Sequence, residues 1–289
     1  MLVFAIIVTY NPEYFLLMQQ YESIKNQVAG IIYVDNNSQN LSLPNENKII
    51  IVKNNKNEGL GKAQNQGIIL AKQKGATHIL LLDQDSVASP DLVKVLLATE
   101  ETYRNKGMDV GLVGPRIHDV LSLPPHDCDA VIFKGVRILR KTLKQEVLSV
   151  SYCIASGSLI PVDVFEDVGL IKEELFIDAL DVEWCLRAKS KGYKVLMTPV
   201  TYLEHRLGNG KCDKISSHSP MREYYICRNS TLLLAYNYIP LGYRIRKLFF
   251  VPIRILYSLF RGYGAYFIEG VKGTIDGVRL IFQHRSTVV

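Results

Sequence analysis

Two aspartates one residue apart, Asp83 and Asp85, have the type and spacing to hold a metal ion. They follow the apolar run 79–82, which predicts a strand buried on both faces and places both carboxylates at its carboxyl end. Open α/β sheets bind ligands at that edge, and carboxylate oxygens are preferred ligands of Mg²⁺ and Mn²⁺. Such a cation would neutralise a diphosphate. Alternatively, the two acids only cap the helix that Pro90 introduces, so the pair alone leaves both interpretations open.

The elements that would position these acids alternate along the first half of the chain. Apolar runs predict strands and helical periodicity predicts helices, with short polar joints between them. The predicted strands are residues 2–8, 30–34, 49–52 and the run before Asp83, and the predicted helices are 13–26 and 57–74. This order predicts a parallel sheet with right-handed crossovers, an α/β architecture typical of nucleotide-binding domains.

Polar residues at the other strand ends extend the candidate site. They are Thr9, Tyr10 and Asn11 after the first strand and Asp35 and Asn36 after the second. Because the carboxyl ends of parallel strands share one edge, we expect these residues in one crevice with Asp83 and Asp85. Asp35 could accept hydrogen bonds from a base N–H or a ribose hydroxyl, and an Asx-turn that closes the strand is the alternative. Gly59 and Gly61 open the next helix, whose N-terminus would attract phosphate.

Two familiar phosphate-binding motifs are excluded by the glycines that are missing. The stretch 59–64 lacks the third glycine of a dinucleotide fingerprint and follows the third predicted strand rather than the first. Ala63 stands where a P-loop requires Ser or Thr, and Lys56 stands where it requires Gly. Dehydrogenases and P-loop NTPases are therefore excluded.

Composition and charge set the outer limits of the interpretation. The chain has 289 residues, of which 48% are hydrophobic, enough for a sizeable core. The net charge of +6 is uneven, because Arg and Lys gather in the last quarter. Five widely spaced cysteines without a Cys-x-x-Cys pair predict reduced thiols and a cytosolic protein. The apolar N-terminus lacks the basic region and cleavage site of a signal peptide, so we expect a first strand there.

Four ordered motifs together carry a family resemblance. Residues 8–12, 34–36, 57–67 and 82–86 resemble, in this order, the motifs of the inverting GT-A glycosyltransferases of family 2. The resemblance implies a Rossmann-like GT-A fold, with a mostly parallel sheet flanked by helices. It also implies a nucleotide-sugar donor, Mn²⁺ or Mg²⁺ held partly by the Asp-x-Asp motif, and a carboxylate base.

The resemblance implies roles for individual residues. Asp83, Asp85 and His205 would hold the metal, although a lone His is also common in a core. Asp181 matches the catalytic base in a helix predicted to begin at Asp178, and Asp178 is the reserve because Leu180 replaces the first acid of the usual Glu-Asp doublet. The residues expected to bind the nucleotide-sugar are Thr9, Tyr10, Asn11, Asp35, Asn36, Gly59, Lys62, Asn65, Asp83, Gln84, Arg222 and Arg228.

Three later segments add detail. The small residues 155–161 resemble the segment that lines the acceptor side in this family, or form only a tight turn. Residues 208–211 predict a mobile loop that could cover the diphosphate. Arg222, Tyr225, Arg228 and Asn229 follow at helical spacing, and this pattern is similar to the helix after the metal site in bacterial rhamnosyltransferases. Arginine is suited to bidentate diphosphate binding, and pairing with the acidic helix is the alternative.

The C-terminal quarter predicts a helical extension. Basic and aromatic residues interleave over 241–285, so we divide the chain into a catalytic domain, 1–215, and a helical region, 216–289. The run 248–260 is too short and too interrupted to span a bilayer. Helices lying on the anionic cytoplasmic surface of the membrane are one interpretation. A homodimer interface or packing against the catalytic domain are the alternatives. No nucleic-acid-binding motif accompanies the basic residues, so we expect no nucleic acid partner.

These expectations combine into one functional hypothesis. We expect a metal-dependent inverting glycosyltransferase that takes L-rhamnose from dTDP-rhamnose to a lipid-linked glycan acceptor in the synthesis of bacterial surface polysaccharide. It would work in the cytoplasm, peripherally on the inner face of the cell membrane. The alternatives are a family 2 transferase that uses a UDP-sugar, such as UDP-galactofuranose or UDP-glucose, and a scaffold that binds nucleotide-sugar without turnover.

Overall fold

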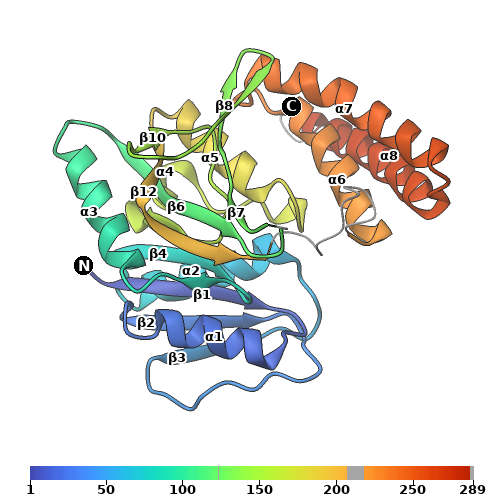
Figure 1. Ribbon diagram of the computed structural model, residues 1–289. Helices are drawn as coiled ribbons and strands as arrows, with labels where there is room; N and C mark the ends of the chain where they lie inside the picture. Colours follow the sequence, from blue (N-terminus) through green and yellow to red (C-terminus); the bar gives the residue numbers. More distant parts are fainter. Residues whose placement is uncertain (123, 207–217, 287–289) are drawn as a thin grey trace.

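The computed structural model describes residues 1–122, 124–206 and 218–286, and a central sheet with helices on both faces dominates it (Figure 1). The strands of the central sheet are β1 (Val3–Thr9), β2 (Gly30–Asp35), β3 (Ile49–Lys53), β4 (His78–Asp83), β5 (Val87–Ala88), β6 (Val110–Asp119), β7 (His126–Asp127), β10 (Leu148–Ser149), β11 (Ser158–Pro161) and β12 (Lys194–His205). A separate hairpin consists of β8 (Ala130–Lys134) and β9 (Arg137–Lys141). The helices are α1 (Tyr14–Ile24), α2 (Leu60–Gln73), α3 (Leu92–Arg104), α4 (Val162–Val168), α5 (Leu180–Ser190), α6 (Pro220–Leu232), α7 (Leu241–Phe260) and α8 (Gly264–Ser286).

Strand order explains where the candidate site lies. The sheet runs β10-β12-β6-β11-β4-β1-β2-β3, and β4, β1, β2 and β3 are mutually parallel. In the register of these strands Thr9 lies opposite Asp35, and Val8 lies opposite Asp83. The polar ends of β1, β2 and β4 therefore meet at one edge, as the sequence predicts.

Both faces of the sheet are buried, which is why its central strands are continuously apolar. Ile6 and Leu81 point to the face that α2, α4 and α5 cover, whereas Ile7 and Leu80 point to the face that α1 and α3 cover. All four side chains are at most 2% exposed. This alternation fixes the register, because a shift by one residue would exchange the two faces.

Three predicted elements differ from the structure. Residues 194–197 predict a short strand, but β12 continues to His205, because it passes Pro199 with a bulge between Met197 and Tyr202 and then pairs again with β6. Residues 158–161, predicted as part of a small-residue segment, form β11, an antiparallel strand between β4 and β6. Helix α5 begins at Leu180 rather than at Asp178, because Asp178 and Ala179 have left-handed backbone angles.

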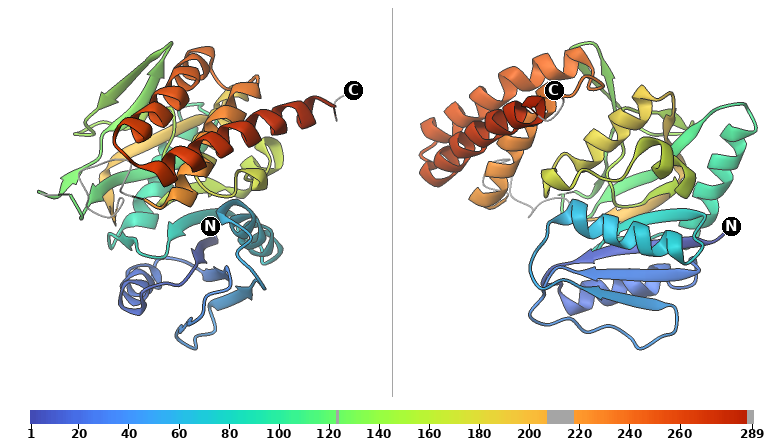
Figure 2. Two further views of the ribbon diagram at one scale, coloured as in Figure 1. Left: turned by 90° about the vertical axis from the view of Figure 1, so that its right-hand side faces the viewer. Right: turned by 180° about the vertical axis from the view of Figure 1, so that it is seen from behind.

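The last quarter of the described chain is helical, as predicted. Helices α6, α7 and α8 pack together beside the sheet, where the β8–β9 hairpin reaches α7 (Figures 1 and 2). Gly273 and Gly277 let α8 approach α6 closely, since a Cβ on Gly273 would lie 2.2 Å from the carbonyl oxygen of Tyr224. Tyr243 of α7 packs against Phe133 of the hairpin, with ring centroids 4.8 Å apart and planes at 36°.

The sequence also predicts that the C-terminal run does not cross a bilayer, and it places a domain boundary and a loop before α6. In the described part of the chain, none of the helices has both the length and the apolarity that a bilayer crossing requires. The boundary predicted between 215 and 216 and the loop predicted at 208–211 lie outside the described residues.

Candidate functional site

Asp83, Asp85 and His205 come together although 122 positions separate the first from the last. Asp83 ends β4, Asp85 lies in the following turn, and His205 ends β12. The histidine Nε2 lies 3.4 Å from an Asp83 carboxylate oxygen, and its Nδ1 lies 3.9 Å from an Asp85 oxygen. One ligand atom from each residue lies within 4.8 Å of the other two.

Two serines hold this triad in place. The Ser86 hydroxyl lies 2.9 Å from His205 Nδ1 and 2.8 Å from the Ser156 hydroxyl. The Asp83 backbone N–H in turn donates to the Ser156 hydroxyl at 3.0 Å. With Nδ1 engaged by Ser86, the Nε2 of His205 is the ring nitrogen that faces Asp83. Partners of this kind orient a metal-binding histidine.

The donor set fits a divalent cation. Two carboxylates and one imidazole converge, and the carboxylate pair favours a hard ion such as Mg²⁺ or Mn²⁺. The pKa of Asp83 is raised because its carboxylate is withdrawn from solvent and lies beside Asp85, although His205 acts in the opposite direction. A bound cation would relieve the repulsion between the two acids.

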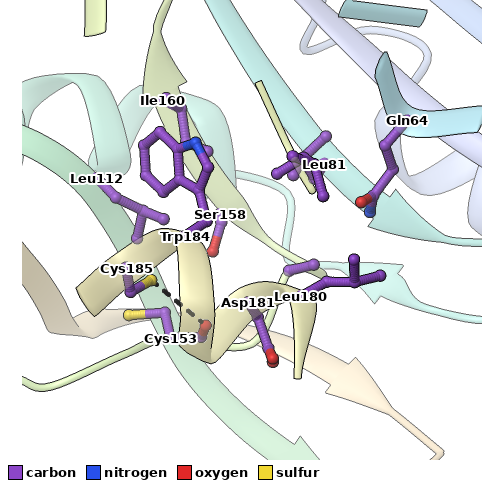
Figure 3. Close-up of a pocket in the computed structure, with 12 residues that line it drawn as sticks. Gln64, Leu81, Leu112, Cys153, Ser158, Ile160, Leu180, Asp181, Trp184 and Cys185 are labelled. Carbon is purple, nitrogen blue, oxygen red and sulfur yellow. Dashed lines mark hydrogen bonds between the residues drawn. The ribbon is translucent and has the colours of Figure 1, made fainter. Parts of the chain in front are cut away.

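Asp181 has very different surroundings. It lies on the first turn of α5 and borders a cavity of about 20 Å³, room for about one water molecule (Figure 3). Apolar side chains dominate the lining, among them Leu81, Leu112, Ile160 and Trp184. Withdrawal from solvent raises the pKa of Asp181 to about 6, and the charges of Asp178 and Asp83 add to this shift. The Val182 N–H, which donates to the carboxylate at 2.8 Å, opposes it.

Arg222 pairs with Asp178 and is influenced by the charges of Asp83 and Asp181. Its guanidinium donates to both carboxylate oxygens of Asp178 at 2.9–3.2 Å, and this bond is the main reason that its pKa is raised. The charges of Asp83 and Asp181 raise it further. Arg222 therefore lies within electrostatic reach of both acids. Because Asp178 is already paired, Asp181 is the better candidate for a base.

The predicted nucleoside residues form one hydrogen-bonded group at the ends of β1 and β2. Asp35 is buried and accepts from the hydroxyls of Thr9, at 3.0 Å, and Ser38, at 2.5 Å. Two contacts tie these ends to neighbouring segments: Gln84 accepts from the Tyr10 N–H at 2.9 Å, and Asn11 accepts from the Gln39 N–H at 2.9 Å. Asn36 extends the group, since its amide donates to the carbonyl of Gly59 at 3.2 Å.

Three predicted donor-binding residues make internal contacts away from the triad. Lys62 pairs with Glu58 at 3.0 Å. The Asn65 amide nitrogen donates to the Ile171 carbonyl at 2.8 Å, and its oxygen accepts from the Ile171 N–H at 3.0 Å. Arg228 donates to the Glu174 carbonyl at 2.6 Å. The roles predicted for these three in donor binding stay predictions.

Three residues around the site received no individual role from the sequence, although each lies in a stretch that the motifs cover: Ser86, Ser156 and Asn229. Ser86 directly follows the Asp-x-Asp motif, so its position was a usable signal. Ser156 reaches Asp83 only because β11 pairs with β4, which the small-residue pattern did not indicate. Asn229 binds backbone carbonyls of the segment before α5, a contact that no local pattern predicts.

The chain resembles known proteins along most of its length. The family described as "Glycosyl transferase family 2" matches residues 4–169. The dTDP-rhamnosyl transferase RfbF of Shigella flexneri is 33% identical over 288 residues, which is 96% of this chain and 95% of that protein.

Solved structures show the same fold. GalNAc-T7, with UDP, GalNAc and Mn²⁺, has a TM-score of 0.59 at 15% identity, over 80% of this chain and 50% of its own. TarS 1–349 of S. aureus, in complex with UDP, has a TM-score of 0.53 at 16% identity, over 82% of this chain and 67% of its own. The GT-A type of α/β fold expected from the motifs is thereby confirmed. The chain is a glycosyltransferase and belongs to glycosyl transferase family 2.

Proposed function

We propose that this glycosyltransferase moves L-rhamnose from dTDP-rhamnose, with inversion, to a lipid-linked saccharide at the inner face of the membrane. One observation carries the reaction: Asp83, Asp85 and His205 converge, and Asp181 lies within electrostatic reach of them. The likeness to RfbF, named a dTDP-rhamnosyl transferase, supports the choice of sugar.

The triad would hold Mn²⁺ or Mg²⁺ beside the diphosphate of the donor. When bound, the cation supplies positive charge against the diphosphate. Arg222, which lies within electrostatic reach of Asp83 and Asp181, adds a fixed guanidinium charge suited to phosphate oxygens. Both charges would be most useful as the nucleoside diphosphate leaves.

Asp181 would act as the base. It would accept the proton of the acceptor hydroxyl while that oxygen attacks the anomeric carbon from the side opposite the departing diphosphate. Since the pKa of Asp181 is raised to about 6, the carboxylate is mostly ionised at neutral pH and remains basic enough to take the proton.

The nucleoside would lie against the ends of β1 and β2. Asp35 uses hydrogen bonds from Thr9 and Ser38 to fix its carboxylate, and a carboxylate has further acceptor positions for a base N–H or a ribose hydroxyl. Tyr10 is 51% exposed and could cover the base.

Helix α7 supports the membrane part of the proposal. One side of this helix exposes large apolar side chains along its whole length: Leu241, Ile245, Leu248, Phe249, Ile253, Leu256, Leu259 and Phe260. Phe249, Ile253 and Phe260 are 62%, 64% and 83% exposed. Arg246 of α7 and Arg261, which directly follows the helix, are exposed, and α7 contains no Asp or Glu. A basic, amphipathic helix of this kind binds anionic lipid surfaces. The arginines suit lipid phosphates, and a symmetric dimer through the apolar side is the alternative that the experiment below tests.

The membrane contact can be measured by co-sedimentation with vesicles. The protein should bind vesicles that contain phosphatidylglycerol more tightly than phosphatidylcholine vesicles, and the triple variant Leu248→Ser, Phe249→Ser, Ile253→Ser should lose most of this binding. Phe15→Ser on α1 is the matched control and should bind normally, because Phe15 is an apolar side chain of similar exposure, 69%, on another helix. Equal binding of the triple variant, or a stable dimer in sedimentation velocity, would contradict the membrane assignment.

The sugar and the reaction can be measured with purified protein, Mn²⁺ and a panel of donors. We expect release of dTDP from dTDP-rhamnose to exceed release of UDP from UDP-galactofuranose and UDP-glucose. Preference for a UDP donor would overturn the sugar assignment and keep the enzyme class. Donor binding without turnover, in the presence of a lipid-linked saccharide, would indicate a scaffold instead.

A further inference from the structure

The segment 173–179, which directly precedes α5, has an unusual backbone. Phe176, Asp178 and Ala179 have φ angles of 60°, 65° and 65°. L residues other than glycine rarely adopt such angles, and they persist only where neighbouring groups hold them. Asp181 follows two residues after this segment. Whatever holds the 173–179 segment therefore also fixes where α5 begins and where Asp181 lies.

Asn229 of α6 binds this segment through its backbone. The side chain is fully buried, and the two N–H groups of its amide are shared among three backbone carbonyls of the segment. The acceptors are the carbonyl oxygens of Leu175 at 2.8 Å, Ile177 at 2.7 Å and Asp178 at 2.9 Å. The amide oxygen accepts from Arg228 Nε at 3.0 Å and Nη2 at 2.9 Å, so the orientation of the amide is fixed.

The same side of α6 makes the other contacts to the segment. Arg228 donates to the Glu174 carbonyl at 2.6 Å, and its guanidinium lies 4.6 Å from the ring centroid of Tyr225. Tyr225 stacks on Phe176, with ring centroids 4.8 Å apart and planes at 9°. Residues 222, 225 and 229 are spaced three and four apart, which places them on one face of a helix.

The opposite side of the segment meets α2. The Phe176 carbonyl accepts from the backbone N–H of Leu60 at 2.6 Å and of Gly61 at 3.4 Å, which are otherwise free donors at the start of that helix. Gly59 is required there, because a Cβ would lie 2.5 Å from the Phe176 ring. The segment is thus held between α2 and α6.

We propose that Asn229 is a positioning residue for Asp181. It holds the left-handed backbone of 173–179 through three carbonyls, and Arg228 orients its amide for this task. Through Asn229, which does not touch substrate, α6 thereby shapes the active site of the sheet domain. This inference rests on the proposed role of Asp181 as base.

The test compares kcat with the KM for the donor in Asn229→Ala. Loss of the amide should lower kcat by about 10- to 100-fold, because small displacements of a catalytic group are costly, while the donor KM changes little. Asn229→Asp keeps the shape but removes the donor, so it should be equally defective. Thr231→Val is the matched control, since the Thr231 hydroxyl donates to the Cys227 carbonyl within α6, at 2.9 Å.

Arg228→Met tests the positioning role of Asn229 if both Asn229 variants fail to fold. It keeps the aliphatic stem over Tyr225 and removes the bonds to Asn229 and Glu174, so kcat should fall with the donor KM unchanged. A folded Asn229→Ala with wild-type kcat, or an Arg228→Met variant whose only change is a raised donor KM, would overturn the inference. Absence of transfer by the wild-type protein would instead refute the proposed function.

Discussion

Two acidic groups face the same site, and their surroundings differ. Asp83 and Asp85 belong to a polar cluster in which serine hydroxyls and His205 surround the carboxylates. Asp181 lies on the first turn of α5 and borders a cavity lined mostly by apolar side chains.

The comparison shows how environment divides the work between identical side chains. Converging oxygens and an imidazole attract a cation, since each ligand is pre-oriented and the acids repel one another without it. A single carboxylate beside apolar groups has a raised pKa and becomes a base. On the proposed mechanism, the first group would bind the metal and Asp181 would take the proton.

Asp181→Asn should have the largest effect, and it tests the proposed role of Asp181 as the base. Asn cannot accept the proton, so kcat should fall by about 10²- to 10⁴-fold, while donor binding persists. The measurement is steady-state transfer at saturating donor and Mn²⁺. Asp167→Asn on α4, an exposed acid paired with Lys191 at 2.9 Å, is the control and should retain activity. An Asp181→Asn variant with more than about a tenth of wild-type kcat would remove Asp181 from the base role.

Asp85→Asn tests the proposed role of the polar cluster in metal binding. Loss of one carboxylate ligand removes a contribution of several kcal/mol, so transfer at a fixed, subsaturating Mn²⁺ concentration should fall by about 10²- to 10³-fold. Unlike Asp181→Asn, this variant should recover partly when Mn²⁺ is raised. Recovery in neither or in both variants would mean that the two groups do not have separate roles.

Ser156→Ala tests whether the serine hydroxyls of the polar cluster support metal binding. The hydroxyl supports both the Asp83 backbone and Ser86, so its loss should weaken Mn²⁺ affinity by about 10- to 100-fold. Electron paramagnetic resonance of bound Mn²⁺ measures this affinity directly. Ser190→Ala at the end of α5, whose hydroxyl donates to the Arg187 carbonyl at 2.7 Å, is the control. Unchanged affinity in Ser156→Ala would show that the triad does not depend on its serines.

The pH profile should show the smallest effect. The pKa of Asp181 is raised to about 6, and the active form is the carboxylate, so activity is full well above that pH and is lost as the pH falls through it. At pH 5 and saturating Mn²⁺, kcat should be about tenfold below its plateau. An acidic limb centred near pH 4 would mean that Asp181 is well solvated, which contradicts the described surroundings.

The polar cluster was largely predictable from the sequence, because most of it comes from strand ends. A buried apolar run followed by acids predicts both the strand and the edge where the acids lie, and β1, β2 and β4 confirm it. His205 required the family resemblance, since a single histidine carries no local pattern. The Ser156 contact depends on β11, a short strand that pairs with residues more than seventy positions away.

The surroundings of Asp181 were less predictable. Helical periodicity placed the start of α5 at Asp178, whereas the left-handed angles at Asp178 and Ala179 delay it to Leu180. The carbonyls of Ile177 and Asp178 accept hydrogen bonds from Asn229 of α6, about fifty residues further along the chain. A local pattern cannot show a conformation that distant residues enforce.

Calorimetric titration of dTDP-rhamnose in the presence of Mn²⁺, into Asp181→Asn and into Asp83→Asn, tests the central claim most directly. Separate roles predict near wild-type affinity for Asp181→Asn and a large loss of affinity for Asp83→Asn. Equal affinities in the two variants, whether both retained or both lost, would contradict the account.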